Sequence, residues 1–175
     1  MTLEHIVLPN RPAPEHPNLV FVLPDRLRQD SMARYGNDWI QSPHMNALAE
    51  RSLVFENAYV TQPVCAPARS SIMTGLYPQA HGLSTNGIPL RPETRTIAEM
   101  VSEEYLCGYY GKWHLGDELR PQHGFDRWLG RETARFIREN RHRPFVLYVN
   151  FLEPHMPYDG PLNDMYPRNQ LNTGP

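Results

Sequence analysis

The amino-acid sequence predicts an α/β fold in which helices sandwich a mostly parallel sheet. Two observations carry this prediction. Strand-like and helix-like patterns alternate along the 175 residues, and this order is typical of parallel sheets covered by helices. The apolar runs are short and continuous, as in strands that are buried on both faces. A chain of this length can bury about 70% of its unfolded surface, so one domain with its own core is expected.

The first half of the chain begins with an arm and continues into strand and helix patterns. Residues 1–17 contain four prolines and no periodicity, which indicates an extended N-terminal arm. An apolar run over 18–23 predicts the first strand. Ser42 followed by Pro43 is typical of a helix start. We therefore expect a helix over 43–51, a strand over 53–60, and a helix over 67–74 that stops at Gly75.

The second half repeats this alternation. We expect a helix over 96–103, a strand over 105–110, a helix over 133–140 and a strand over 144–149, the last being the clearest apolar run. Residues 161–175 show no element pattern and are expected to form an irregular tail. The sequence thus predicts a single domain over 18–160.

Composition excludes several classes of protein. The formal net charge is −2, which argues against a strong field for nucleic acids or membranes. The two cysteines, Cys65 and Cys107, are too few for a disulfide scaffold, and Cys107 is expected to be an inert core thiol. No apolar run approaches the ~18 residues of a membrane span. The first 20 residues lack the apolar stretch of a secretory signal, so a cytoplasmic protein is expected.

Lysine usage singles out one position. Of the 17 basic residues, 16 are arginines and the remaining one is Lys112. A site that needs a compact ammonium group rather than a planar guanidinium would explain this choice.

Reactive side chains follow the expected strands or begin the next helix. In parallel sheets, ligands bind at the carboxyl ends of the strands, and the residues found there are Asp25, Cys65, Lys112, His114 and His155. Cys65 lies at a helix start, where free backbone N–H groups favour anions and lower a thiol pKa. Arg69 follows one turn later and can face back toward Cys65. The alternative is a small buried cysteine beside a surface arginine.

Longer motifs give these residues a context. The segment 63–75, with Cys65, Pro67, Arg69 and Thr74-Gly75, resembles the signature of the sulfatase family, part of the alkaline-phosphatase-like superfamily. Residues 18–25 resemble the family's opening strand with its metal-binding aspartate, 111–116 its second signature, and 151–158 its late histidine motif. The resemblance covers nearly the whole chain but only the N-terminal portion of a usual sulfatase, so it implies a truncated alkaline-phosphatase-like domain.

The resemblance implies a nucleophile and a metal. In the family, the cysteine at the position of Cys65 is oxidised to formylglycine by a dedicated maturation enzyme. Its hydrate offers one hydroxyl for attack on sulfur and a second that expels sulfate afterwards. Asp25 and the diol derived from Cys65 would bind a divalent cation, Ca²⁺ or alternatively Mg²⁺ or Mn²⁺.

The other four residues would act around the nucleophile. Arg69 would hold the diol, and Lys112 would bridge the nucleophile and a sulfate oxygen. His114 would act as a base in aldehyde regeneration, and His155 would assist the leaving oxygen. The implied activity is hydrolysis of sulfate monoesters, with a small-molecule or carbohydrate sulfate ester as substrate.

The sequence departs from the family at two points that bear on the metal. Many sulfatases have a second aspartate where this chain has Arg26, and the family's later Asp-Asn pair has no match before Pro175. We therefore expect weak metal binding and little activity from this chain alone. We also expect an uncovered sheet edge after the 145–149 strand. Two alternatives stay open: a phosphate or phosphonate ester hydrolase of the same superfamily, and a non-catalytic sulfatase remnant.

Overall fold

The computed structural model describes residues 15–129, 133–155 and 165. Most of the expected arm, 1–17, and most of the expected tail, 161–175, lie outside the described residues. Part of the late histidine motif, from residue 156 onward, also lies outside them.

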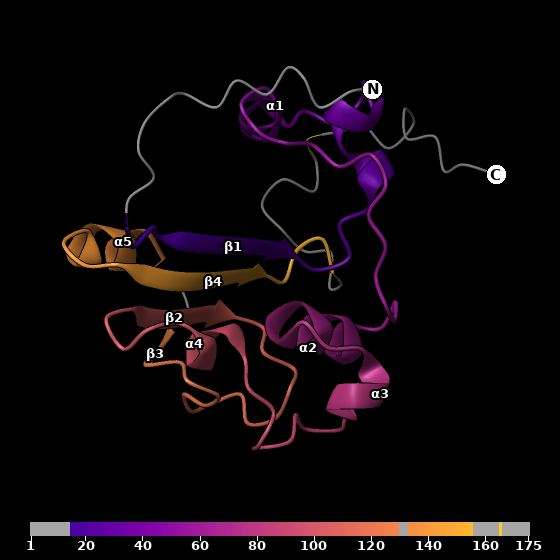
Figure 1. The fold of residues 1–175 in the computed structure, drawn as a ribbon. Coiled ribbons are helices and arrows are strands. Elements are labelled where there is room, and N and C mark those ends of the chain that lie inside the picture. The colour runs from indigo at the N-terminus through magenta and orange to yellow at the C-terminus, as the bar shows by residue number, and fades with distance from the viewer. Residues whose placement is uncertain (1–14, 130–132, 156–164, 166–175) are drawn as a thin grey trace.

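A four-stranded parallel sheet organises the described part of the chain (Figure 1). Its strands are β1 (Leu19–Pro24), β2 (Leu106–Gly111), β3 (Arg127–Leu129) and β4 (Phe145–Phe151), in the order β1-β4-β2-β3. All three pairings are parallel, which confirms the predicted α/β fold class. The carboxyl ends of β1, β4 and β2 coincide, because Pro24 pairs with Phe151 and Gly111 with Asn150.

The helices are short. They are α1 (Pro43–Ala49), α2 (Cys65–Thr74), α3 (Pro78–His81), α4 (Ile97–Met100) and α5 (Thr133–Asn140), with two 3₁₀ turns, η1 (Gln29–Ser31) and η2 (Ala33–Tyr35). α2 stops where Gly75 adopts φ +70°, a left-handed conformation that glycine allows. α4 begins at a capping box in which Thr96 and Glu99 satisfy each other's free backbone N–H groups.

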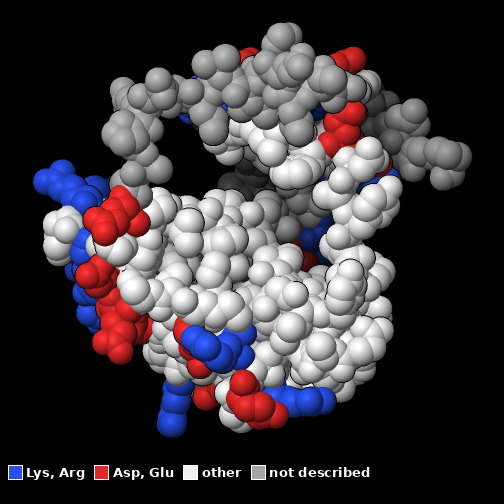
Figure 2. Space-filling model, viewed as in Figure 1, with Lys and Arg blue, Asp and Glu red and all other residues white. Residues whose placement is uncertain are grey.

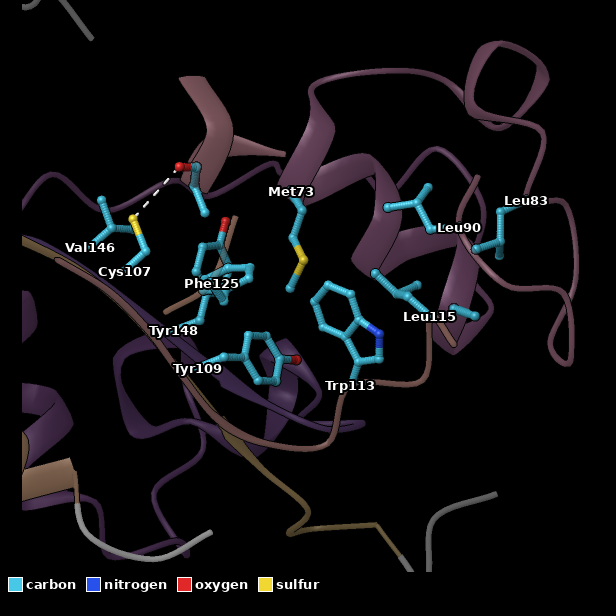
Figure 3. Packing of buried hydrophobic residues seen from close by; sticks show 12 residues of the cluster. Met73, Leu83, Leu90, Cys107, Tyr109, Trp113, Leu115, Phe125, Val146 and Tyr148 are labelled. Atoms are coloured by element: carbon cyan, nitrogen blue, oxygen red, sulfur yellow. Dashed lines mark hydrogen bonds between the residues drawn. The ribbon is translucent and has the colours of Figure 1, made fainter. Parts of the chain in front are cut away.

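Two hydrophobic clusters lie on opposite faces of the sheet, since alternate residues of β2 and β4 belong to different clusters. The larger cluster joins Cys107, Tyr109, Val146 and Tyr148 of the sheet to buried residues of α2, α4 and the loops after β2 (Figure 3). The smaller cluster contains the remaining sheet positions and Phe136 of α5. Helices therefore cover both faces, as predicted.

Trp113 belongs to the aromatic part of the larger cluster. It is fully buried and meets Tyr109 edge to face, with ring centroids 5.0 Å apart. Trp128 stacks on Tyr109 at 4.8 Å and meets Trp113 at 5.0 Å, so the three rings contact one another. Such pairs stabilise a core beyond their buried area. They fix the chain just after β2, where Lys112 and His114 lie.

The structure contradicts two sequence predictions. Residues 53–60 are not a strand but an irregular, mostly exposed segment. Its backbone carbonyls accept hydrogen bonds from side chains rather than from a neighbouring strand. Gln29 donates to Glu56 O, and Tyr35 donates to Phe55 O. The prediction of an uncovered sheet edge after the 145–149 strand is also wrong. This strand is β4, which pairs with β1 on one side and with β2 on the other.

Smaller differences concern element bounds. β3 and α3 were not predicted, and the helix expected over 96–103 is limited to Ile97–Met100. Cys107 is buried, its thiol donates to Ala98 O at 3.7 Å, and burial raises its pKa to about 11. No helix in the described ranges is long and apolar enough to cross a membrane.

Candidate active site

The carboxyl ends of β1, β2 and β4 meet the N-terminus of α2 at one edge of the sheet (Figure 1). In the space-filling view the molecule is hollowed on this side, between the part that carries α1 and the body that carries the sheet (Figure 2). The rest of the visible face of the body is mostly uncharged, with charged side chains near its rim.

Asp25 is the centre of the polar cluster at this edge. Its carboxylate accepts a hydrogen bond from Lys112 Nζ at 2.6 Å and lies 3.5 Å from Arg69 Nη2. The Cys65 thiol donates to its other oxygen at 4.0 Å. The backbone N–H of Asp25 donates to Phe151 O at 3.0 Å, which ties the residue to the end of β4. Lys112 and helix α2 thus contact the carboxylate of Asp25, and β4 holds its backbone.

The charge balance around Asp25 is set by its basic neighbours. Burial raises the pKa of its carboxyl, but the hydrogen bond and charge of Lys112, with the charges of Arg69 and His155, outweigh burial and hold the pKa below its usual range. The side chains of Asp25 and Arg69 are each 6% exposed and that of Lys112 is 17% exposed. Two cations therefore share one carboxylate in a largely desolvated place, which leaves a positive excess for an anion.

Helix α2 presents Cys65 and Arg69 to the cluster. Cys65 is its first residue, and Arg69 follows one turn later on the same side. Asn86 Oδ1 accepts the Ala66 N–H at 3.0 Å, which satisfies one of the free donors of the first turn. Arg69 also donates from Nη1 to the Lys112 carbonyl at 2.9 Å.

Lys112 owes its position to the turn after β2. Gly111 has φ +88°, and a Cβ there would lie 1.9 Å from Asn150 O, so no other residue fits between β2 and β4 at this point. The Lys112 carbonyl accepts a second hydrogen bond from Tyr109 Oη at 2.5 Å. Tyr109 Oη in turn accepts a hydrogen bond from Asn150 Nδ2.

His114 is held by its backbone. It adopts φ +64°, and its N–H and that of Trp113 both donate to the Glu118 carboxylate, at 2.7 and 3.1 Å. Within the described part of the chain, its Nδ1 is buried and has no hydrogen-bond partner. Burial and the charges of Lys112 and Arg69 lower the pKa of its imidazole, with the carboxylates of Glu118 and Asp25 acting in the opposite direction. His114 is therefore neutral at pH 7 and can accept a proton.

His155 lies at the end of the described chain after β4. Its N–H donates to Leu152 O at 2.8 Å in a turn, and its charge contributes to the lowered pKa of Asp25. Side-chain contacts join four of the six candidate residues of the sequence analysis, Asp25, Cys65, Arg69 and Lys112. His114 and His155 are related to this cluster by charge alone. The catalytic roles of all six stay predictions.

The described residues do not by themselves fit the expected Ca²⁺ site. Among residues 15–129, 133–155 and 165, no three His, Cys, Asp or Glu side chains are grouped so that they could hold a metal ion. Ca²⁺ takes 6–8 oxygen ligands, whereas Asp25 offers one carboxylate that Lys112 and Arg69 already engage. Arg26 is exposed, and its guanidinium cannot supply the carboxylate oxygens that a second aspartate would offer at this position.

Sequence reasoning missed three residues that shape the site: Tyr109, Glu118 and Asn150. Asn150 directly follows the expected strand 144–149, so the rule that polar residues after strands line the site could have found it. Tyr109 carried no signal, because an aromatic residue inside an apolar run looks like core. Glu118 acts on backbone groups whose direction depends on the left-handed His114, which the sequence does not reveal.

Comparison with known proteins agrees with the motifs. The family model described as Sulfatase matches residues 17–136. The ulvan-active sulfatase of Formosa agariphila is 36% identical over 129 residues, which cover 69% of this chain and 25% of that protein. Human N-acetylgalactosamine-6-sulfatase is 33% identical over 155 residues, covering 77% of this chain and 29% of that one. The chain thus spans about a quarter of the length of these curated relatives.

Solved structures agree on the fold. A Bacteroides fragilis protein described as a sulfatase, yidJ, superposes with a TM-score of 0.75 at 24% identity, covering 93% of this chain and 48% of that one. The phosphonate monoester hydrolase of Agrobacterium radiobacter superposes with a TM-score of 0.72 at 19% identity, over 87% and 44% of the two chains. The shared fold is therefore the alkaline-phosphatase-like one, and it does not separate sulfate from phosphonate chemistry.

Proposed function

The chain belongs to the sulfatase family, and on that premise we propose that it carries the nucleophile half of a site that hydrolyses sulfate monoesters. One observation carries the proposal: Cys65, Arg69 and Lys112 surround Asp25 at the carboxyl edge of the sheet. A nucleophile position next to two desolvated cations is what attack on an anionic ester requires.

Cys65 is the proposed precursor of the nucleophile. When a maturation enzyme oxidises its side chain to formylglycine, the hydrated aldehyde supplies a hydroxyl at this position that can attack sulfur. The first turn of α2 favours negative charge where that hydroxyl would lose its proton. Cys65 is partly exposed, whereas the buried Cys107 is out of reach of a modifying enzyme.

Arg69 and Lys112 are proposed to bind the sulfate oxygens and offset the charge of the attacking group. Their two positive charges face the single negative charge of Asp25, so the cluster gains a balanced charge when a sulfate monoester with one negative charge enters. Because Asp25 and Arg69 are buried, this attraction is weakly screened by solvent.

The two histidines are proposed to move protons. The unpaired, buried Nδ1 of His114 and its lowered pKa suit a base. His155, which follows β4 and acts electrostatically on Asp25, suits a donor to the leaving oxygen.

We propose a carbohydrate sulfate ester as the substrate class. The support is the relatives: those that share this segment include an ulvan-active sulfatase and an N-acetylgalactosamine-6-sulfatase. A small-molecule sulfate ester and a phosphate or phosphonate ester are the alternatives that an assay with matched aryl esters would separate.

The decisive test of the nucleophile is chemical. The protein is produced together with a formylglycine-generating enzyme, and the tryptic peptide 52–69 is analysed by mass spectrometry for an aldehyde at Cys65. We expect conversion in wild type and in Cys107→Ala, and none in Cys65→Ala. An unmodified thiol at Cys65, with the maturation enzyme shown to be active on another substrate, would contradict the proposal.

Activity is the second test. The aldehyde-bearing chain is assayed with an aryl sulfate, an aryl phosphate and an aryl phosphonate, with and without added Ca²⁺, and metal binding is titrated by calorimetry. We expect weak Ca²⁺ binding and little turnover by this chain alone, since the described residues lack a complete ligand set. Tight binding together with rapid turnover would show that the described residues do not make up the whole site.

A further inference from the structure

The backbone carbonyl of Lys112 accepts two side-chain hydrogen bonds from different elements. Arg69 Nη1, from α2, donates at 2.9 Å and Tyr109 Oη, from β2, donates at 2.5 Å. A carbonyl with both lone pairs engaged has little freedom to turn. The residue that carries the only lysine side chain of the protein is therefore held at its backbone as well as at its ammonium group.

The direction of the hydrogen bonds extends this hold to β4. Tyr109 Oη has one proton, which it gives to the Lys112 carbonyl, so it can only accept from Asn150. The amide nitrogen of Asn150 must then face Tyr109. Burial raises the pKa of Tyr109, so the hydroxyl stays protonated and remains a donor. Asn150 is itself buried, with 4% of its surface exposed.

We propose that Tyr109 and Asn150 are positioning residues that hold Lys112 so that its ammonium group lies against Asp25. We call the chain of hydrogen bonds from Asn150 through Tyr109 to the Lys112 carbonyl the lysine clamp. The inference rests on the proposed function for its purpose, since it is as a sulfate ligand that Lys112 would need a fixed position. The clamp itself rests on the geometry alone.

A neighbouring tyrosine separates this role from simple packing. Tyr109 and Tyr148 are both buried, and their rings lie 6.1 Å apart and nearly parallel. Within the described part of the chain, Tyr148 Oη has no hydrogen-bond partner. Core packing explains both rings, but only the clamp explains the hydroxyl of Tyr109. Tyr148→Phe is therefore a matched control for Tyr109→Phe.

The test uses the single lysine as a probe. The full chain is treated with a small amine-reactive acetylating ester, and the rate at which Lys112 is acetylated is followed by mass spectrometry of the peptide that contains it. Removal of one hydrogen bond that orders a residue increases access to its reactive form by about threefold or more. We therefore expect Lys112 to react at least about threefold faster in Tyr109→Phe than in wild type, and at the wild-type rate in Tyr148→Phe.

A second variant keeps the test decisive if Tyr109→Phe folds poorly. Asn150→Ala removes the donor to Tyr109 but keeps the ring and its hydroxyl, and we expect faster acetylation there too, by a smaller factor. Urea unfolding of each variant shows that the reaction is measured on folded protein. The wild-type rate in both Tyr109→Phe and Asn150→Ala would overturn the clamp, as would an equal acceleration in Tyr148→Phe.

The clamp and the proposed function fail in different ways. Acetylation of Lys112 requires no aldehyde, cation or turnover, so it reports on the clamp whatever the fate of Cys65. An unmodified Cys65 with an intact clamp would refute the proposed function alone. Formylglycine at Cys65, together with the wild-type rate of Lys112 acetylation in both Tyr109→Phe and Asn150→Ala, would refute the clamp alone.

Discussion

Two regions of the molecule differ sharply in how they are built. The segment 26–64, which contains η1, η2 and α1, has no buried residue, and it exposes large apolar side chains such as Phe55 and Tyr59. The packed body, made of the sheet with α2 to α5, contains every buried side chain of the described chain except Asp25. Asp25 and Cys65, which flank the segment, nevertheless approach to 4.0 Å between Oδ1 and Sγ.

This contrast shows which region positions the chemistry. The ends of the exposed segment are fixed by the packed body, through the Asp25 N–H bond to β4 and the packing of α2. The side chains that contact the Asp25 carboxylate in the described part of the chain come from α2 and from the turn after β2, and not from this segment. Equivalent residues placed in the two regions should therefore respond very differently to substitution.

A tryptophan pair gives the largest expected difference. Trp113 is fully buried and Trp39 is 54% exposed. We expect Trp113→Ala to lower the free energy of unfolding by ~3–5 kcal/mol, because it leaves a cavity among aromatic rings. Trp39→Ala should change it by less than ~0.5 kcal/mol. Urea unfolding followed by circular dichroism measures both, and similar losses would mean that the segment is packed as tightly as the body.

An aspartate pair tests the polar cluster. Asp25→Asn leaves Lys112 and Arg69 without their shared carboxylate, so we expect a loss of ~2–3 kcal/mol in the free energy of unfolding. Asp38→Asn, in the exposed segment, should be nearly neutral and serves as the control. A stability of Asp25→Asn equal to wild type would show that the ion pairs of Asp25 contribute nothing to the fold.

A histidine pair gives the smallest expected effect, visible as a dependence on pH. His81 is buried, accepts the Leu83 N–H at Nδ1 and contacts Ser71 Oγ through Nε2. Burial and the charge of Arg91 lower the pKa of its imidazole. The unfolded chain therefore takes up a proton that the folded chain resists, and the free energy of unfolding falls as the pH drops below about 6.5.

Two variants isolate this contribution. In His81→Gln the decrease in the free energy of unfolding between about pH 7.5 and about pH 5.5 should be smaller than in wild type. Part of the decrease should remain, because the pKa of His114 is also lowered. His44→Gln, in the exposed α1, should retain the full decrease. An unchanged pH dependence in His81→Gln would show that another group titrates over this range.

The same contrast explains what the sequence could and could not predict. Most strands and helices of the packed body were predicted, and β3 and α3 were missed. The strand over 144–149 was predictable because its apolar run is buried, and the helix over 67–74 because Gly75 marks its end. The strand expected over 53–60 was wrong because its apolar residues lie on an exposed segment, and β propensity decides little where no neighbouring strand is available. The order β1-β4-β2-β3 was beyond reach, since it depends on how the connections cross the sheet.

The candidate site was predictable to the extent that motifs and strand ends define it. Asp25, Cys65, Arg69 and Lys112 were predicted at one edge, and the structure brings them together. The direction of each interaction was not predictable. The ammonium group of Lys112 donates to the Asp25 carboxylate, and the hydroxyl of Tyr109 donates to the Lys112 carbonyl. Both interactions depend on side-chain positions that the spacing of residues does not encode.

The central position of β4 determines when the protein can fold. β1 is synthesised well before β4, and the Phe145 N–H finds its acceptor at Asn18, 127 positions away. Contacts of such long sequence separation slow folding, because a large loop must close before any of them forms. On the ribosome, β1 lacks its neighbour until the chain as far as Phe151 has emerged, so the bond that fixes Asp25 cannot form before then. The edge of the sheet that holds Asp25 is thus completed only after β4 has been synthesised, long after Asp25 itself.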